Sequence, residues 1–268
     1  MPTSTPVFEI AALVRPDLPA PAVPYAGFPR YNFIGGHNDA ASTPVEGLRA
    51  AADAVFKREG ATLATYGLES GPLGYRPLRD FLVKKLAAQS GISCSADEIL
   101  ITSGSLQGLD LVNELLVAPG DTVLIEQDCY GGTITRLNRL KANIVGMSLD
   151  DDGIRMDALA TQLEELKTKG IRPKYIYTIP TVQNPTASVM PLARREELLR
   201  LAMAYGVPIF EDECYAEDLT DALEQLAGKK PGSVQAETFG YMLRGFFEAM
   251  RRHIAFEQTH LPPLAKAG

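Results

Sequence analysis

Short apolar runs alternate along the chain with longer stretches in which apolar residues recur at helical spacing. Short β-branched runs predict buried strands, and recurrence every three to four residues predicts helices with one buried face. The predicted strands are Glu98–Thr102, Asp121–Gln127, Asn143–Met147, Lys174–Pro180 and a run beginning at Val207. The predicted helices are Pro44–Glu59, Arg76–Ser90, the residues after Gln107 through Leu116, Gly131 to about Lys141, Met156–Lys169 and Pro191–Tyr205.

This alternation of strands and helices predicts an α/β fold with a mostly parallel, doubly wound sheet flanked by helices. We expect three parts. Residues 1–60 form a proline-rich arm and a helix, residues 61–220 form a large α/β domain, and residues 221–268 form a helical C-terminal segment. In open α/β sheets the ligand binds beyond the carboxyl ends of the strands, so polar residues at those ends are the candidate site.

Charge and composition exclude several classes of function. A net charge of −7 argues against a nucleic-acid or anionic-membrane surface, and no apolar run is long enough to span a membrane. The N-terminus carries no secretory signal pattern. Cys94, Cys129 and Cys214 are scattered and the three histidines do not cluster, so we expect no metal site and a cytoplasmic location.

A small polar turn joins the first predicted strand to the helix that follows it. Unpaired N–H groups and the helix dipole make such a helix start an anion site, to which hydroxyl groups add donors. A capped helix without a ligand is the alternative. The residues of this turn are Ser103, Gly104, Ser105, Leu106 and Gln107.

Three later strands also end in chemically useful side chains. Tyr130 is placed to stack on a flat ring or, alternatively, to pin the next helix. Asn184 precedes a proline that holds its backbone extended, which presents a fixed amide. Asp212 is followed by Tyr215, and an acidic helix cap is the alternative reading of that aspartate. Phosphate donors, a stacking ring, an amide and a carboxylate suit a phosphorylated pyridine cofactor.

Glycines mark two further segments. Gly35 and Gly36 permit close approach of the backbone to a ligand, and we take them as candidate substrate contacts, with a simple turn as the alternative. The loop Thr65–Gly74 has the wrong spacing for a dinucleotide fingerprint, and no Walker A motif is present. A nicotinamide-dependent oxidoreductase is therefore disfavoured.

These motifs, in this order, resemble those of the fold-type I, pyridoxal-phosphate-dependent aminotransferases of class I/II. The resemblance covers about residues 31–220. Gln183-Asn184-Pro185-Thr186 resembles the family's Gln-Asn-Pro-Thr-Gly motif, with Ala187 in place of the glycine. The other matching segments are Tyr66-Gly67, Gly74, Leu78-Arg79, the Ser103–Gln107 turn, Tyr130 and the Asp212–Tyr215 pair.

The resemblance implies pyridoxal 5′-phosphate as the cofactor and transfer of an amino group between an amino acid and a 2-oxo acid. It implies that Asp212 bonds the pyridine nitrogen, that Asn184 and Tyr215 bond the phenolic oxygen, and that Tyr130 stacks on the ring. The Ser103–Gln107 turn would bind the phosphate. In the family a tyrosine at the position of Tyr66 reaches the phosphate of the neighbouring subunit, which implies a homodimer.

One part of the family pattern is missing. The family uses a lysine that attaches covalently to the cofactor, and it lies downstream of the Asp-x-x-Tyr element. The lysines after Thr220 are Lys229, Lys230 and Lys266, and none stands in the family's setting. Lys229 and Lys230 are weak candidates beside a Pro-Gly turn. Residues 221–268 also look truncated relative to the family, so a non-catalytic or truncated cofactor-binding relative is the alternative function.

Overall fold

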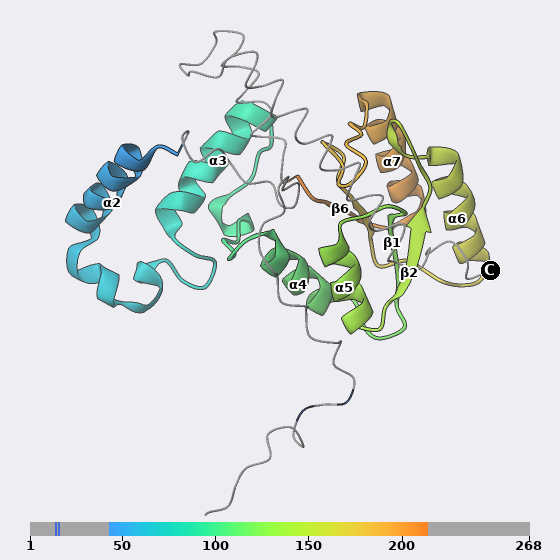
Figure 1. The fold of residues 1–268 in the computed structure, drawn as a ribbon, viewed down its shortest axis with the longest axis horizontal. Coiled ribbons are helices and arrows are strands. Elements are labelled where there is room, and N and C mark those ends of the chain that lie inside the picture. The colour runs from blue at the N-terminus through green and yellow to red at the C-terminus, as the bar shows by residue number, and fades with distance from the viewer. Residues whose placement is uncertain (1–13, 15, 17–42, 214–268) are drawn as a thin grey trace, which may run out of the picture. The chain divides into compact units, whose positions relative to one another are not determined.

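The computed structural model describes residues 43–213 together with residues 14 and 16, and it excludes the side chains of residues 66 and 68. The helices and strands of the described residues fall within the unit Phe33–Gly268 (Figure 1). In chain order they are α2 (Val45–Glu59), η2 (Gly60–Ala64), η3 (Tyr66–Glu69), α3 (Arg76–Ser90), η4 (Ala96–Glu98), α4 (Ser105–Leu116), β1 (Thr122–Glu126), α5 (Gly131–Arg139), β2 (Asn143–Met147), β3 (Leu149–Asp150), β4 (Gly153–Ile154), α6 (Met156–Thr168), β5 (Ile176–Thr178), α7 (Leu192–Tyr205) and β6 (Ile209–Glu211).

The main sheet has four parallel strands in the order β2-β1-β5-β6. From β1 the chain passes through α5 to β2 on one side. It then crosses back through α6 to β5, on the other side of β1. The strand order therefore reverses between β1 and β5. Such a reversal opens a crevice at the carboxyl ends of the strands, which is where ligands of open α/β sheets bind.

Side chains alternate between the two faces of the sheet and so build two cores. Val123 and Ile125 of β1 pack in a cluster with residues of α4 and α5, whereas Leu124 packs in a cluster with residues of α6 and α7. All three are completely buried, which contributes about 2 kcal/mol for each side chain. Figure 1 shows α5 and α6 on opposite sides of β1 and β2. The predicted doubly wound, parallel α/β sheet is confirmed.

The predicted strand Glu98–Thr102 is wrong. η4 ends at Glu98, and the residues after it are extended at Ile99 but join no ladder among residues 43–213. A strand requires a neighbouring strand to complete its hydrogen bonds, and no local pattern can supply one. Here the backbone N–H of Ile101 instead donates to the carbonyl oxygen of Leu73, over 2.9 Å.

Several boundaries also differ from the prediction. The predicted strand Lys174–Pro180 forms a ladder only over β5, although Tyr175, Ile179 and Pro180 beside it are also buried. The predicted acidic turn Asp150–Gly153 is the turn of a small antiparallel hairpin, β3–β4. The predicted helix over residues 76–90 matches α3, and the predicted strand over residues 143–147 matches β2.

The glycine-rich loop before α3 is held by one buried cation. Arg79 is 3% exposed and donates to the backbone carbonyl oxygens of Ser70, Gly74 and Ala96, at 3.0, 3.1 and 2.6 Å. A Cβ atom on Gly74 would lie 2.6 Å from Cβ of Ile101, so only glycine allows this approach. Together these contacts join the loop to the segment that leads into α4.

Candidate functional site

The carboxyl ends of β1, β5 and β6 meet at the edge where the strand order reverses. The backbone N–H of Asp212, just after β6, donates to the carbonyl oxygen of Thr178 at the end of β5, over 3.0 Å. The hydroxyl of Thr178 donates to Glu126 at the end of β1, over 2.6 Å. Three segments far apart in sequence therefore present their ends side by side.

Within the described residues, Asp212 is hydrogen-bonded through one of its two side-chain carboxylate oxygens. Tyr177, on β5, donates its hydroxyl to Oδ2 of Asp212 over 2.6 Å. Its ring is completely buried and stacks on Phe210, with the centroids 5.7 Å apart. Burial, together with the nearby Cys129 and Asp212, raises the pKa of Tyr177 far above its usual value, so the hydroxyl remains a donor. No residue in the described range bonds Oδ1 of the half-buried Asp212.

Glu126 is the hub of a buried polar network. It is 0% exposed, and its Oε1 accepts from Thr178 and from the backbone N–H of Ile179 at 2.6 and 3.0 Å. Its Oε2 accepts from Nε2 of Gln183 at 2.8 Å. Burial raises the pKa of Glu126 to about 7, although these three donors oppose the shift.

Asn184 lies in the turn that this network holds. Gln183 is 1% exposed and bonded at both ends of its amide, whereas Asn184 is half-buried. The peptide bond between Asn184 and Pro185 is cis. The side-chain amide of Asn184 makes no hydrogen bond with any residue in the described part of the chain. The turn that carries Asn184 is held by its neighbours, and a fixed, outward amide at this position remains a prediction.

Tyr130 immediately precedes α5 at the same edge. It follows the loop whose Asp128 carbonyl oxygen accepts from Gln183 over 2.6 Å. Its ring lies directly over Gly132, because a Cβ atom there would be 2.3 Å from Cε1 of the ring. The half-buried ring therefore depends on a glycine two residues away, and its hydroxyl is unbonded within residues 43–213.

The Ser103–Gln107 turn begins α4 without a side-chain cap. Gly104 occupies the N-cap position at φ 86°, a conformation that favours glycine. Oε1 of Gln107 accepts the N–H of Ser103 over 2.5 Å, so this one donor is already used. In the described structure no group accepts the next three N–H groups, those of Gly104, Ser105 and Leu106.

Contacts farther along α4 orient this turn. Asp110 pairs with Arg136 in the middle of α5 over 2.8 Å. One turn later, Asn113 accepts from the hydroxyl of Tyr175, just before the start of β5. The helix therefore runs toward the amino ends of the strands, and its first N–H groups point to the carboxyl edge. No hydrogen bond or ion pair of the described residues joins the turn itself to Tyr130, Asn184 or Asp212.

The other predicted site residues cannot be placed. Gly35, Gly36, Tyr215, Lys229 and Lys230 lie outside the described residues, as does the side chain of Tyr66. Two buried members of the site were missed by sequence reasoning, namely Glu126 and Tyr177. The only signal for Glu126 is a glutamate that closes an apolar strand, and Tyr177 reads as an ordinary core aromatic.

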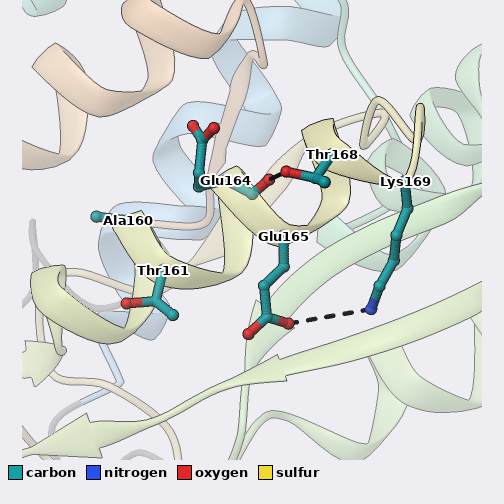
Figure 2. A pocket seen from close by; sticks show the side chains of 6 residues that line it. All are labelled: Ala160, Thr161, Glu164, Glu165, Thr168 and Lys169. Atoms are coloured by element: carbon teal, nitrogen blue, oxygen red, sulfur yellow. Dashed lines mark hydrogen bonds and ion pairs between the residues drawn. The ribbon is translucent and has the colours of Figure 1, made fainter.

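A shallow, open hollow of about 580 Å³ lies elsewhere, beside one face of α6 (Figure 2). Glu165 and Lys169 form an ion pair there at 4.0 Å, and both are more than half exposed. This is the solvated outer face predicted for that helix, and it contains none of the predicted site residues. Within residues 43–213 we find no cluster of metal-ligating side chains and no helix long and apolar enough to cross a membrane.

Comparison with known proteins gives a consistent match. Residues 37–239 match the family described as aminotransferase class I and II. Aromatic-amino-acid aminotransferase 1 of Thermococcus litoralis is 34% identical over 69% of this chain and 44% of its own length. The 2-aminoadipate transaminase of Thermus thermophilus is 33% identical over 69% of this chain and 43% of its own. The chain thus spans less than half the length of these curated relatives.

Solved structures agree in fold. The kynurenine aminotransferase of Pyrococcus horikoshii, solved with PMP, aligns with a TM-score of 0.61 and 34% identity, over 66% of this chain and 43% of that one. The α-aminoadipate aminotransferase LysN of Thermus thermophilus, solved with a phosphopyridoxyl-leucine, aligns with a TM-score of 0.58 and 25% identity. That alignment covers 86% of this chain and 71% of the other.

Proposed function

Because this chain belongs to the aminotransferase class I and II family, we propose that it binds pyridoxal 5′-phosphate and moves an amino group between an amino acid and a 2-oxo acid. The cofactor-binding part is residues 61–220. The curated relatives are named for aromatic amino acids and 2-aminoadipate, so these are the substrates to test first.

The residues at the sheet edge fit this cofactor. Oδ1 of Asp212, which no residue of the described range bonds, would accept from a protonated ring nitrogen, while Tyr177 orients the carboxylate through Oδ2. Asn184, whose amide has no partner among residues 43–213, would bond the phenolic oxygen, with Tyr215 as its proposed partner there. Tyr130 offers its ring for stacking. When bound, pyridoxal phosphate supplies an electron sink for bond breaking at the α-carbon of the substrate.

The start of α4 fits the phosphate. The N–H groups of Gly104, Ser105 and Leu106, which have no acceptor in the described part of the chain, lie at the positive end of the helix dipole, beside the hydroxyls of Ser103 and Ser105. The side-chain oxygen Oε1 of Gln107 would not bond the phosphate, because both are hydrogen-bond acceptors. Oε1 instead accepts the N–H of Ser103 and so closes the turn. Its role is to shape the turn.

One observation carries the proposal. The side chains that would touch the cofactor, Asp212 and Asn184, are half-buried and keep a polar atom that no residue of the described range bonds. The residues that hold them are buried and hydrogen-bonded. A rigid support under unbonded polar ends is what a preorganised site requires, because the reacting group must be held within a fraction of an ångström.

Absorption titration of the purified chain with pyridoxal phosphate tests this proposal. We expect saturable binding, with the Kd raised about tenfold or more in D212N and N184A, since a hydrogen bond to a charged group contributes about 1.5–3 kcal/mol. D53N and N138A, at exposed positions on α2 and α5, are matched controls and should keep the wild-type Kd. The absence of saturable binding would refute the proposal.

Borohydride reduction distinguishes an active aminotransferase from a relative that binds the cofactor without catalysis. Cofactor that becomes fixed to the protein requires an attached lysine, and peptide mapping would then show whether it is Lys229 or Lys230. Cofactor that binds but washes away after reduction supports the non-catalytic relative.

We also propose a homodimer located in the cytoplasm. Tyr66 of one subunit would reach the phosphate bound by its partner, so Tyr66→Phe should weaken cofactor binding only where sedimentation shows a dimer. The unpaired thiols of Cys94 and Cys129 support a reducing compartment.

A further inference from the structure

Gln183 has only one orientation in which all of its neighbours are satisfied. Its Nε2 donates to Oε2 of Glu126 at 2.8 Å and to the carbonyl oxygen of Asp128 at 2.6 Å. Its Oε1 accepts from both the backbone N–H and the hydroxyl of Thr186, each at 2.7 Å. If the amide were reversed, its NH₂ group would face the backbone N–H of Thr186, which is also a donor. Its oxygen would face the acceptor oxygens of Glu126 and Asp128.

Glu126 favours this orientation together with the carbonyl oxygen of Asp128 and the N–H of Thr186, because at pH 8 its ionised carboxylate accepts hydrogen bonds and cannot donate them. With Nε2 of Gln183 turned toward Glu126, Oε1 faces Thr186, which follows Asn184 in the chain, and accepts its hydrogen bonds. Two backbone bonds clamp the same turn: the N–H of Gln183 donates to Ser188 at 2.9 Å, and the N–H of Ala187 donates to Gln183 at 2.6 Å. Asn184 lies inside this closed turn.

We propose that Glu126 is a positioning residue that acts through Gln183 to hold the amide of Asn184 in place for the cofactor. This inference rests on the proposed function and adds a residue that would not itself touch the cofactor. Stability alone does not account for Glu126, since burying its ionised carboxylate opposes folding at neutral pH. A fixed, acceptor-only anchor for Gln183 is what the carboxylate provides.

Glu126→Gln is the variant that tests this proposal, since it keeps the shape of the side chain and adds a donor that faces Nε2 of Gln183. At pH 8 we expect the Kd for pyridoxal phosphate to rise about tenfold. The decisive measurement is a double-mutant cycle with Asn184→Ala. If Glu126 acts through Asn184, E126Q added to N184A leaves the Kd within about twofold of that of N184A alone.

Two further variants keep the test sharp. Gln183→Met removes the hydrogen bond between Gln183 and Glu126 but leaves Glu126 bonded to Thr178 and Ile179. It replaces E126Q in the test if E126Q does not fold. Glu165→Gln makes the same chemical change on the exposed face of α6 and should keep the wild-type Kd. The absorption band of the bound cofactor gives a second readout. It should shift equally in E126Q and N184A, because both lose the same hydrogen bond to the phenolic oxygen.

If the losses of binding free energy in E126Q and N184A add up in the double variant, Glu126 acts independently of Asn184. That result would overturn the proposal. An unchanged Kd in both E126Q and Q183M would overturn it as well. Both results leave the proposed function intact, since wild-type protein still binds the cofactor. Wild-type protein that binds no cofactor would overturn the proposed function and this proposal together.

Discussion

Replacing Glu126 with glutamine should change how the stability of the fold depends on pH. In the unfolded chain this carboxyl group ionises near its ordinary pKa of 4.5, whereas burial raises its pKa in the folded protein to about 7. The folded state therefore favours the protonated form. The contribution of this group to stability is fully present below about pH 4.5 and is lost as the pH rises through about 7.

The size of the effect follows from the shift. Each pKa unit corresponds to about 1.4 kcal/mol, so a shift from 4.5 to about 7 corresponds to about 3 kcal/mol of stability in total. Most of this loss falls between pH 5 and pH 8. Glutamine does not titrate, so the free energy of unfolding of wild-type protein relative to E126Q should fall by roughly 2–3 kcal/mol over that interval.

Urea unfolding followed by circular dichroism at pH 5, 6, 7 and 8, without cofactor, measures this difference. All other titrating groups are common to both proteins and cancel, so the slope is informative even if E126Q is less stable throughout. E165Q alters an exposed glutamate, so the difference in its free energy of unfolding from wild type should not change with pH. A difference that does not change with pH would refute the reasoning. It would mean that the three donors around Glu126 outweigh its burial and keep it ionised.

Three further substitutions have expected outcomes. Y177F removes the hydroxyl that bonds Asp212 and keeps the buried ring, so urea unfolding at pH 7 should show a loss of about 1–2 kcal/mol; wild-type stability would contradict this. Ala187 has φ 63°, where glycine is favoured, so A187G should raise the free energy of unfolding by about 1 kcal/mol, and a decrease would count against the described turn. G132A places a methyl group 2.3 Å from the ring of Tyr130, so it should displace the ring. The Kd for pyridoxal phosphate in the absorption titration should then rise several-fold, and an unchanged Kd would mean that the ring has no part in binding.

The local pattern located most of the elements well. The helix α3 and the strand β2 begin and end where the sequence predicts, because apolar spacing and flanking turn residues are local properties. The predicted strand at residues 98–102 failed because the identity of its neighbour is not a local property. The site residues Asn184 and Asp212 were found because each follows an apolar run, where a polar residue stands out.

Glu126 and Tyr177 were missed for the opposite reason. Glu126 closes an apolar strand, where a glutamate reads as a strand end, and Tyr177 lies inside one, where a tyrosine reads as core. Their roles depend on partners 35 to 57 residues away in sequence, which are Asp212 for Tyr177 and Gln183 for Glu126. No spacing rule relates residues that distant, since only the strand order brings them together.

The sequence by itself determined the α/β class, the parallel sheet and the set of polar side chains at its strand ends, because hydrophobic periodicity and turn chemistry act over a few residues. Only the tertiary structure decided which ends share an edge, which polar atoms stay unbonded and which carboxylate is buried. Those outcomes depend on strand order and on desolvation, and both arise from contacts between segments that are distant along the chain.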